Sequence, residues 1–123
     1  TAAEYFSSRC FDAIVTNPPY ERRGAGILND SSRLNIARHE ISCTLSDIIE
    51  KASYLLKNGG DFMMVNHTER LADAIEEMRK HRIEPKNLQF VFSDITAKPV
   101  LFLVHGVLFG GKNLIIEKGI EVK

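Results

Sequence analysis

The stretch FDAIVTNPPY, from Phe11 to Tyr20, decides the fold. Residues 11–16 are short, apolar and β-branched, and the two prolines that follow cannot continue the hydrogen bonding of a sheet. The pattern therefore predicts a buried strand that runs directly into a loop. Ligands of open α/β sheets bind at the carboxyl ends of the strands, so residues 17–20 stand where a binding site is expected.

The tetrapeptide Asn17-Pro18-Pro19-Tyr20 has groups suited to holding a planar amine. The side-chain carbonyl of Asn17 and the backbone carbonyl of Pro18 are hydrogen-bond acceptors, and together they can take the two hydrogens of an –NH2 group. Tyr20 offers a flat face on which a base can stack. The same four residues could also be no more than a rigid turn that ends a strand.

Helical and strand patterns alternate after this motif. A loop over residues 20–33 precedes a helix predicted at Ile36–Lys57, with Asn58-Gly59-Gly60 as its stop. Asp61–Val65 is predicted as a second buried strand. Thr68 is then expected to cap a second helix, which has apolar residues at helical spacing. These residues are Leu71, Ala74, Ile75 and Met78.

The remaining chain predicts strands. Pro85 is expected to end the helical region, and Leu88–Phe92 and Pro99–Phe109 are predicted as antiparallel strands because their connection is short. A weaker strand is predicted at Leu114–Glu117. Helices between the early strands indicate an α/β fold with a parallel sheet, to which the antiparallel strands add at one edge. Four phenylalanines on these strands are expected in the core: Phe90, Phe92, Phe102 and Phe109.

Composition excludes several classes of protein. The 123 residues carry 16 Lys plus Arg and 16 Asp plus Glu, so whole-chain charge does not indicate a nucleic-acid binder. Cys10 and Cys43 lack the spacing of a zinc site or a disulfide scaffold, and we expect both to be reduced in a cytoplasmic protein that binds no metal. No apolar run approaches the roughly 20 residues that span a bilayer, so no membrane contact is expected.

A glycine-rich turn for a nucleotide-type cofactor is missing from the sequence. Such a turn follows the first strand of a cofactor-binding sheet. Gly24-Ala25-Gly26 follows a Pro-Pro-Tyr loop and Gly110-Gly111 lies between strands, so neither has that context. Either the protein does not use such a cofactor, or the residues that bind it lie upstream of Thr1.

The motif at residues 11–20 resembles the catalytic motif of S-adenosylmethionine-dependent amino-group methyltransferases. In that family the motif follows the fourth strand of a seven-stranded Rossmann-like sheet. Further segments resemble the branch that methylates adenine N6 in tRNA, and the similarity extends over residues 11–109. These segments are 37–40, 43–45, 55–60, 69–71 and 78–86. The sequence departs from the branch at His67-Thr68-Glu69-Arg70, where a His-Arg-Pro-Glu-Arg type of segment is expected.

The resemblance implies a fold, a cofactor and a partner. Residues 1–123 would form the catalytic, C-terminal half of the sheet, with S-adenosylmethionine bound mostly by other residues and tRNA as the substrate. Asn17, Pro18, Pro19 and Tyr20 would be catalytic, and Asn17 would also contact the cofactor. The isolated chain would bind cofactor poorly and show no turnover.

Basic side chains near the motif are candidates for substrate binding. Arg22 and Arg23 flank Tyr20 in the loop. Arg38 and His39 open the long helix, where they either contact substrate or form an ion-pair cluster at the helix start. The basic stretch Arg79–Arg82, with Lys86 nearby, either receives RNA phosphates or is a solvated helix end.

Other readings of the sequence remain open. The same chemistry would serve a glutamine side chain in a release factor, or an amino group of cytosine or adenine in DNA. A non-catalytic module that binds tRNA is a hypothesis of another class. The apolar strand at residues 11–16, if it lies at a bare sheet edge, also predicts self-association.

Overall fold

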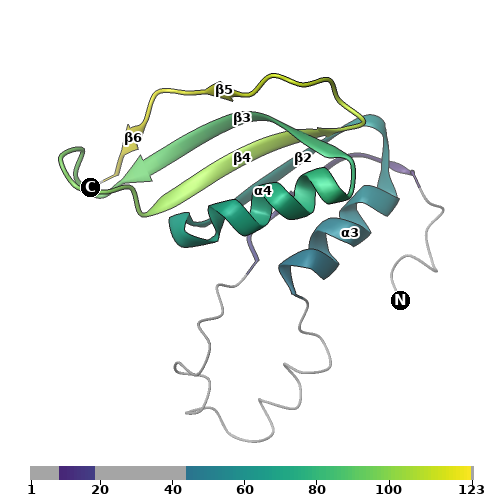
Figure 1. The fold of residues 1–123 in the computed structure, drawn as a ribbon, viewed down its shortest axis with the longest axis horizontal. Coiled ribbons are helices and arrows are strands. Elements are labelled where there is room, and N and C mark those ends of the chain that lie inside the picture. The colour runs from purple at the N-terminus through teal and green to yellow at the C-terminus, as the bar shows by residue number, and fades with distance from the viewer. Residues whose placement is uncertain (1–8, 19–43, 123) are drawn as a thin grey trace, which may run out of the picture.

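The computed structural model describes residues 9–18 and 44–122. Its elements form a mixed sheet with helices against it (Figure 1). The strands are β1 (Phe11–Thr16), β2 (Leu56–His67), β3 (Ile83–Phe92), β4 (Leu101–Leu108), β5 (Ile115–Ile116) and β6 (Ile120–Glu121). The helices are α3 (Leu45–Leu55), the 3₁₀ turn η2 (Thr68–Arg70) and α4 (Leu71–Lys80). No helix of the described residues is long and apolar enough to cross a membrane.

The sheet has the strand order β1-β2-β4-β3-β5, and β6 also pairs with β3. β1 and β2 are parallel, and β4 is antiparallel to both β2 and β3. The predicted parallel and antiparallel pairs are thus confirmed. The β3–β4 hairpin adds to the parallel pair beside β2, with β4 between β2 and β3. Alternate residues of β4 are buried there, among them Phe102 and Val104.

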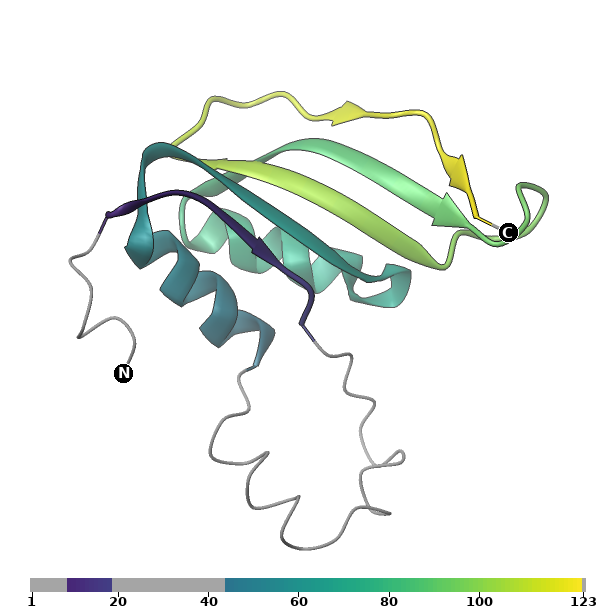
Figure 2. The same cartoon turned by 180° about the vertical axis from the view of Figure 1, so that it is seen from behind.

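Both described α-helices lie on the same face of the sheet (Figures 1 and 2). The predicted stripe of α4 is confirmed, since Ala74 and Met78 are fully buried and Leu71 and Ile75 pack against the core. Thr44 caps α3: its Oγ1 accepts from the Asp47 N–H at 3.1 Å, and the Asp47 carboxylate accepts from the Thr44 N–H at 3.2 Å.

The end of the long helix differs from its prediction. α3 ends at Leu55 and Leu56 is already extended, so Asn58-Gly59-Gly60 is not a helix stop; residues 36–43 of the predicted helix lie outside the described residues. Residues 57–60 instead form a bulge in β2. Phe11 pairs with Leu56 and Ala13 pairs with Asp61, so four residues of β2 face Asp12 alone. Gly59, with φ of 80°, permits this excursion.

Thr68 does not cap the second helix, contrary to the prediction. Its hydroxyl donates to the Pro99 carbonyl at 3.1 Å, and its N–H donates to the Val100 carbonyl at 3.2 Å. These bonds tie the end of β2 to the loop before β4. The α4 N-terminus is preceded by η2 and has no side-chain cap.

Two further predictions are corrected within the strands. Helix α4 ends at Lys80, and Pro85 lies inside β3, at an irregularity of the register with β4 that suits a residue without an N–H. Phe102 is fully buried and Phe90 packs on the core, but Phe109 is 52% exposed because β4 ends one residue before it. The predicted strand at Leu114–Glu117 is reduced to Ile115–Ile116, and β6 was not predicted.

Candidate active site at the carboxyl end of β1

Asn17 and Pro18 directly follow β1, as the motif predicts. Asn17 is exposed, whereas Pro18 is buried. Thr16 pairs with Met64 on β2, and the two strands run parallel. The residues that follow them therefore reach the same edge of the sheet, the edge at which α/β folds bind ligands.

The end of β2 adds a residue that the sequence analysis missed. Asn66 is 4% exposed, and its side-chain carbonyl accepts from the backbone N–H of His67 at 2.7 Å. This hydrogen bond and the contacts of Thr68 with the loop before β4 hold the edge in one shape. The signal in the sequence was a polar residue near the end of β2, the strand that pairs in parallel with the one that Asn17 follows.

The described residues bring together only part of the predicted site. Asn17 and Pro18 stand at the edge as expected. The predicted catalytic residues Pro19 and Tyr20 and the predicted substrate contacts lie outside the described residues. Those contacts are Arg22, Arg23, Arg38 and His39.

The groups at this end of β1 are an exposed side chain and a buried proline. Asn17 and Pro18 supply two carbonyl acceptors at an exposed strand end. Within residues 9–18 and 44–122, no strand leads through a glycine-rich turn into a helix. In the described part of the chain no three His, Cys, Asp or Glu side chains are grouped to hold a metal ion.

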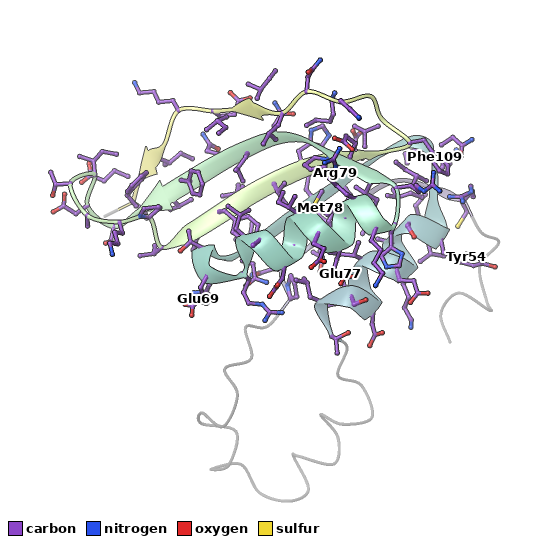
Figure 3. All side chains as sticks on the ribbon, viewed as in Figure 1. Tyr54, Glu69, Glu77, Met78, Arg79 and Phe109 are labelled. Carbon is purple, nitrogen blue, oxygen red and sulfur yellow. The ribbon has the colours of Figure 1, made fainter. Side chains whose placement is uncertain are left out.

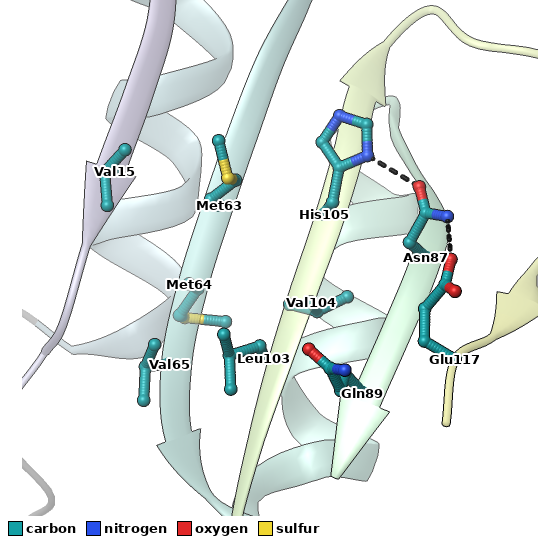
Figure 4. A pocket seen from close by; sticks show the side chains of 10 residues that line it. All are labelled: Val15, Met63, Met64, Val65, Asn87, Gln89, Leu103, Val104, His105 and Glu117. Carbon is teal, nitrogen blue, oxygen red and sulfur yellow. Dashed lines mark hydrogen bonds between the residues drawn. The ribbon is translucent and has the colours of Figure 1, made fainter. Parts of the chain in front are cut away.

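A second candidate location is an apolar cavity of about 250 Å³ on the face of the sheet opposite α3 and α4 (Figure 4). Val15, Met63, Val65 and Leu103 line it from three strands. These apolar side chains supply contact area. The polar side chains of Asn87, Gln89, His105 and Glu117 complete the lining.

A polar row borders this cavity. The Asn87 amide donates to Glu117 Oε2 at 2.7 Å, and its carbonyl accepts from His105 Nδ1 at 2.8 Å (Figure 4). The other ring nitrogen of His105 is 2.8 Å from Asp61 Oδ1. Both ring nitrogens are therefore engaged, and the row links β2, β4, β3 and the segment after β5. We assign it a structural role.

Comparisons with known proteins identify the fold and not the family. No protein-family model and no curated protein matches the chain. Among solved structures, a protein from Agrobacterium tumefaciens described as a predicted O-methyltransferase aligns with a TM-score of 0.64 at 17% identity. The alignment covers 90% of this chain and 42% of that one.

A protein from Thermus thermophilus, described as a DNA modification methylase and solved with S-adenosyl-L-methionine, aligns with a TM-score of 0.61 at 17% identity. It is covered over 53% of its length, and this chain over 91%. The chain thus spans about half the length of the structures that it matches. At this identity the likeness shows a shared methyltransferase-type fold.

Proposed function

We propose that these residues belong to an S-adenosylmethionine-dependent methyltransferase that modifies an exocyclic amino group. One observation carries the proposal: an exposed Asn17 backed by a buried Pro18 at the carboxyl end of a parallel strand, in a fold shared with methyltransferases. The strand order β1-β2-β4-β3 supports the further proposal that residues 1–123 form the C-terminal half of a seven-stranded Rossmann-like sheet.

Asn17 and Pro18 would act by positioning. Two carbonyl acceptors that take both hydrogens of an –NH2 group leave the nitrogen lone pair facing away from them. Fixing that direction holds the nitrogen close to the methyl group in an orientation ready for attack. In well-oriented reactions such positioning lowers the activation free energy by several kcal/mol, on the order of 7–11 at most. S-adenosylmethionine would supply the methyl group as an electrophile. No covalent bond to the protein is needed.

The proposed substrate is adenine N6 in tRNA, and we propose that the protein works in the cytoplasm. The support is the set of segments between residues 37 and 86 that resemble the tRNA branch. Tyr20 would stack on the base, which must leave its helix or come from a single-stranded loop. Arg22, Arg23, Arg38 and His39 would contact the RNA, and Asn17 would also contact the cofactor.

Transfer of a labelled methyl group from S-adenosylmethionine tests the proposal. The full-length product of the gene is incubated with tRNA, with DNA and with a glutamine-containing peptide. We expect label in tRNA, and a roughly 10²–10³-fold loss with Asn17→Ala, the cost of removing one preorganised hydrogen-bonding group from an active site. Asn58→Ala is the matched control, because Asn58 is also exposed but lies in the bulge near the start of β2.

The outcomes separate the chemistry from the substrate. Full activity of Asn17→Ala would refute the assigned role of the motif. If DNA or the peptide is labelled instead, and Asn17→Ala abolishes that label, the proposed amine chemistry would stand. The substrate would then be DNA or a glutamine side chain and not tRNA. The 123-residue chain alone should bind the cofactor weakly, which equilibrium dialysis measures, since its described residues form no adenosyl cradle.

We also propose self-association through β1. Among the described strands β1 has a single partner, β2, and Val15 is 71% exposed. An apolar strand with one free edge can pair with the same strand of a second molecule.

A further inference from the structure

A basic hollow lies at the end of the sheet opposite Asn17. Its volume is about 550 Å³, and Arg79, Arg82, Glu84, Phe109 and Gly110 line it. Arg79 and Phe109 lie at the same end of the molecule, near the start of β3 (Figure 3). β1 alone, with six residues at about 3.3 Å each, separates this end from Asn17 by roughly 20 Å.

The backbone around the hollow is held in an uncommon conformation. Arg82 and Phe109 have φ of 68° and 61°, in the left-handed region that disfavours side chains. The two residues are also joined, since the Phe109 N–H donates to the Arg82 carbonyl at 2.7 Å. This bond fixes an exposed aromatic ring next to an arginine.

Positive charge dominates the hollow and its border. The Arg9 guanidinium lies 5.3 Å from the centroid of the Phe109 ring. Glu84 accepts from Arg79 Nε at 3.3 Å. Within the described part of the chain, the Arg82 side chain has no hydrogen bond or ion pair. Arg79 and Arg82 thus line the hollow with one carboxylate. Arg9 lies at its border, where its guanidinium also donates to the Ser53 and Leu56 carbonyls at 2.8 and 3.2 Å.

A solvated helix end would explain basic residues at 79–82, because cations favour the C-terminus of a helix. It does not explain the aromatic ring. Phe109 is 52% exposed, on a different element, and bonded to the turn that carries Arg82. Cations next to an exposed ring form the combination that holds a single nucleic-acid strand, with phosphates on the cations and a base on the ring.

We propose that this hollow binds single-stranded nucleic acid, with backbone phosphates at Arg79 and Arg82 and a base stacked on Phe109. The site adds a second contact, about 20 Å from Asn17, for the nucleic acid of the proposed function. The geometry of the hollow supports this binding site, and binding to it is measured without methyl transfer. Failure of one proposal is therefore distinguishable from failure of the other.

Fluorescence anisotropy with labelled RNA and DNA oligonucleotides of one sequence, over a series of salt concentrations, tests the site in the full-length product of the gene. The double variant Arg79→Gln/Arg82→Gln should reduce the slope of log affinity against log salt by about 2, one for each lost phosphate contact. Lys51→Gln/Lys118→Gln is the matched control, because it removes the same charge from exposed positions on α3 and between β5 and β6.

Phe109→Gly separates binding from folding. Glycine accepts a positive φ without strain, so the melting temperature should not fall by more than a few degrees. The affinity should fall about five-fold or more, the lower limit for a lost base stack. Binding by RNA or DNA identifies the preferred strand. Unchanged affinity in both the arginine and the Phe109 variants, or an equal loss in the lysine control, would overturn the proposal.

Discussion

Gly106 on β4 offers the sharpest test of the packing between the sheet and α4. A Cβ atom added there would lie 2.5 Å from Met78 Cε, 2.7 Å from Ile83 Cγ2 and 3.1 Å from the Glu84 carbonyl oxygen. Met78 and Ile83 are both fully buried. The Met78 methyl can swing aside, but the Ile83 methyl is branched on a paired strand, and the Glu84 oxygen belongs to the backbone.

Gly106→Ala must therefore shift the sheet or the helix by about 1 Å, since ordinary carbon contacts begin near 3.5 Å. Overpacking of a full core costs about 1–3 kcal/mol. If the free energy of unfolding falls by about 2 kcal/mol per molar urea, the urea concentration at the unfolding midpoint should fall by roughly 0.5–1.5 M. Gly111→Ala is the control, because nothing lies within 4 Å of its Cβ and its φ is not positive.

Urea unfolding followed by circular dichroism measures both variants. The control should stay within about 0.5 kcal/mol of the parent, the usual range of a surface substitution. Adding Met78→Ala to Gly106→Ala should cost less than the sum of the two single changes, because the cavity of one accommodates the methyl of the other. A loss below about 0.5 kcal/mol for Gly106→Ala, with additive energies in the double variant, would refute this account of the packing.

Other parts of the chain give three more predictions. Val15→Lys should make the protein monomeric at concentrations where the parent associates, because a charge blocks edge pairing; association that persists in sedimentation analysis would exclude β1 as the contact. Thr44→Ala removes the α3 cap and should lower stability by about 1 kcal/mol, or about 4 °C in melting temperature, whereas Thr44→Ser should not. Hydrogen bonds from the backbone and the hydroxyl of Thr96 hold the pKa of the Asp94 carboxyl below its ordinary value. Its small contribution to stability is therefore complete above the ordinary pKa and is lost as the pH falls through the lowered one. Carbon-detected NMR titration of Asp94 checks the shift, and Thr96→Ala should raise the midpoint; no change would contradict the hydroxyl contribution.

Much of the local structure could be predicted from the sequence. The apolar run before Asn17 indicated β1, but β1 is mostly exposed and not buried as predicted, because among the described strands it pairs only with β2. The helical spacing from Leu71 to Met78 indicated the buried stripe of α4. The period of a strand or a helix depends only on residues that are neighbours in the sequence, so it can be recognised without knowledge of the fold. The location of Asn17 directly after β1 could be predicted for the same reason.

The predictions that failed depended on partners distant in the sequence. Thr68 has the side chain of a helix cap, but its hydroxyl bonds to Pro99, 31 residues away. Gly59 is a residue type that commonly ends helices, but it lies in a bulge of β2 whose size is set by the pairing of β1 with β2. Local propensity is weak beside such tertiary contacts.

The candidate sites divide along the same line. The sequence by itself determined that Asn17 and Pro18 follow a strand, since an apolar β-branched run before two prolines needs only adjacent residues. Only the tertiary structure placed β4 between β2 and β3, buried Asn66 beside the motif, and left Phe109 exposed against Arg82. Those outcomes arise from hydrogen bonds and burial between segments far apart in the chain, and the balance of such terms is settled only when the whole sheet forms.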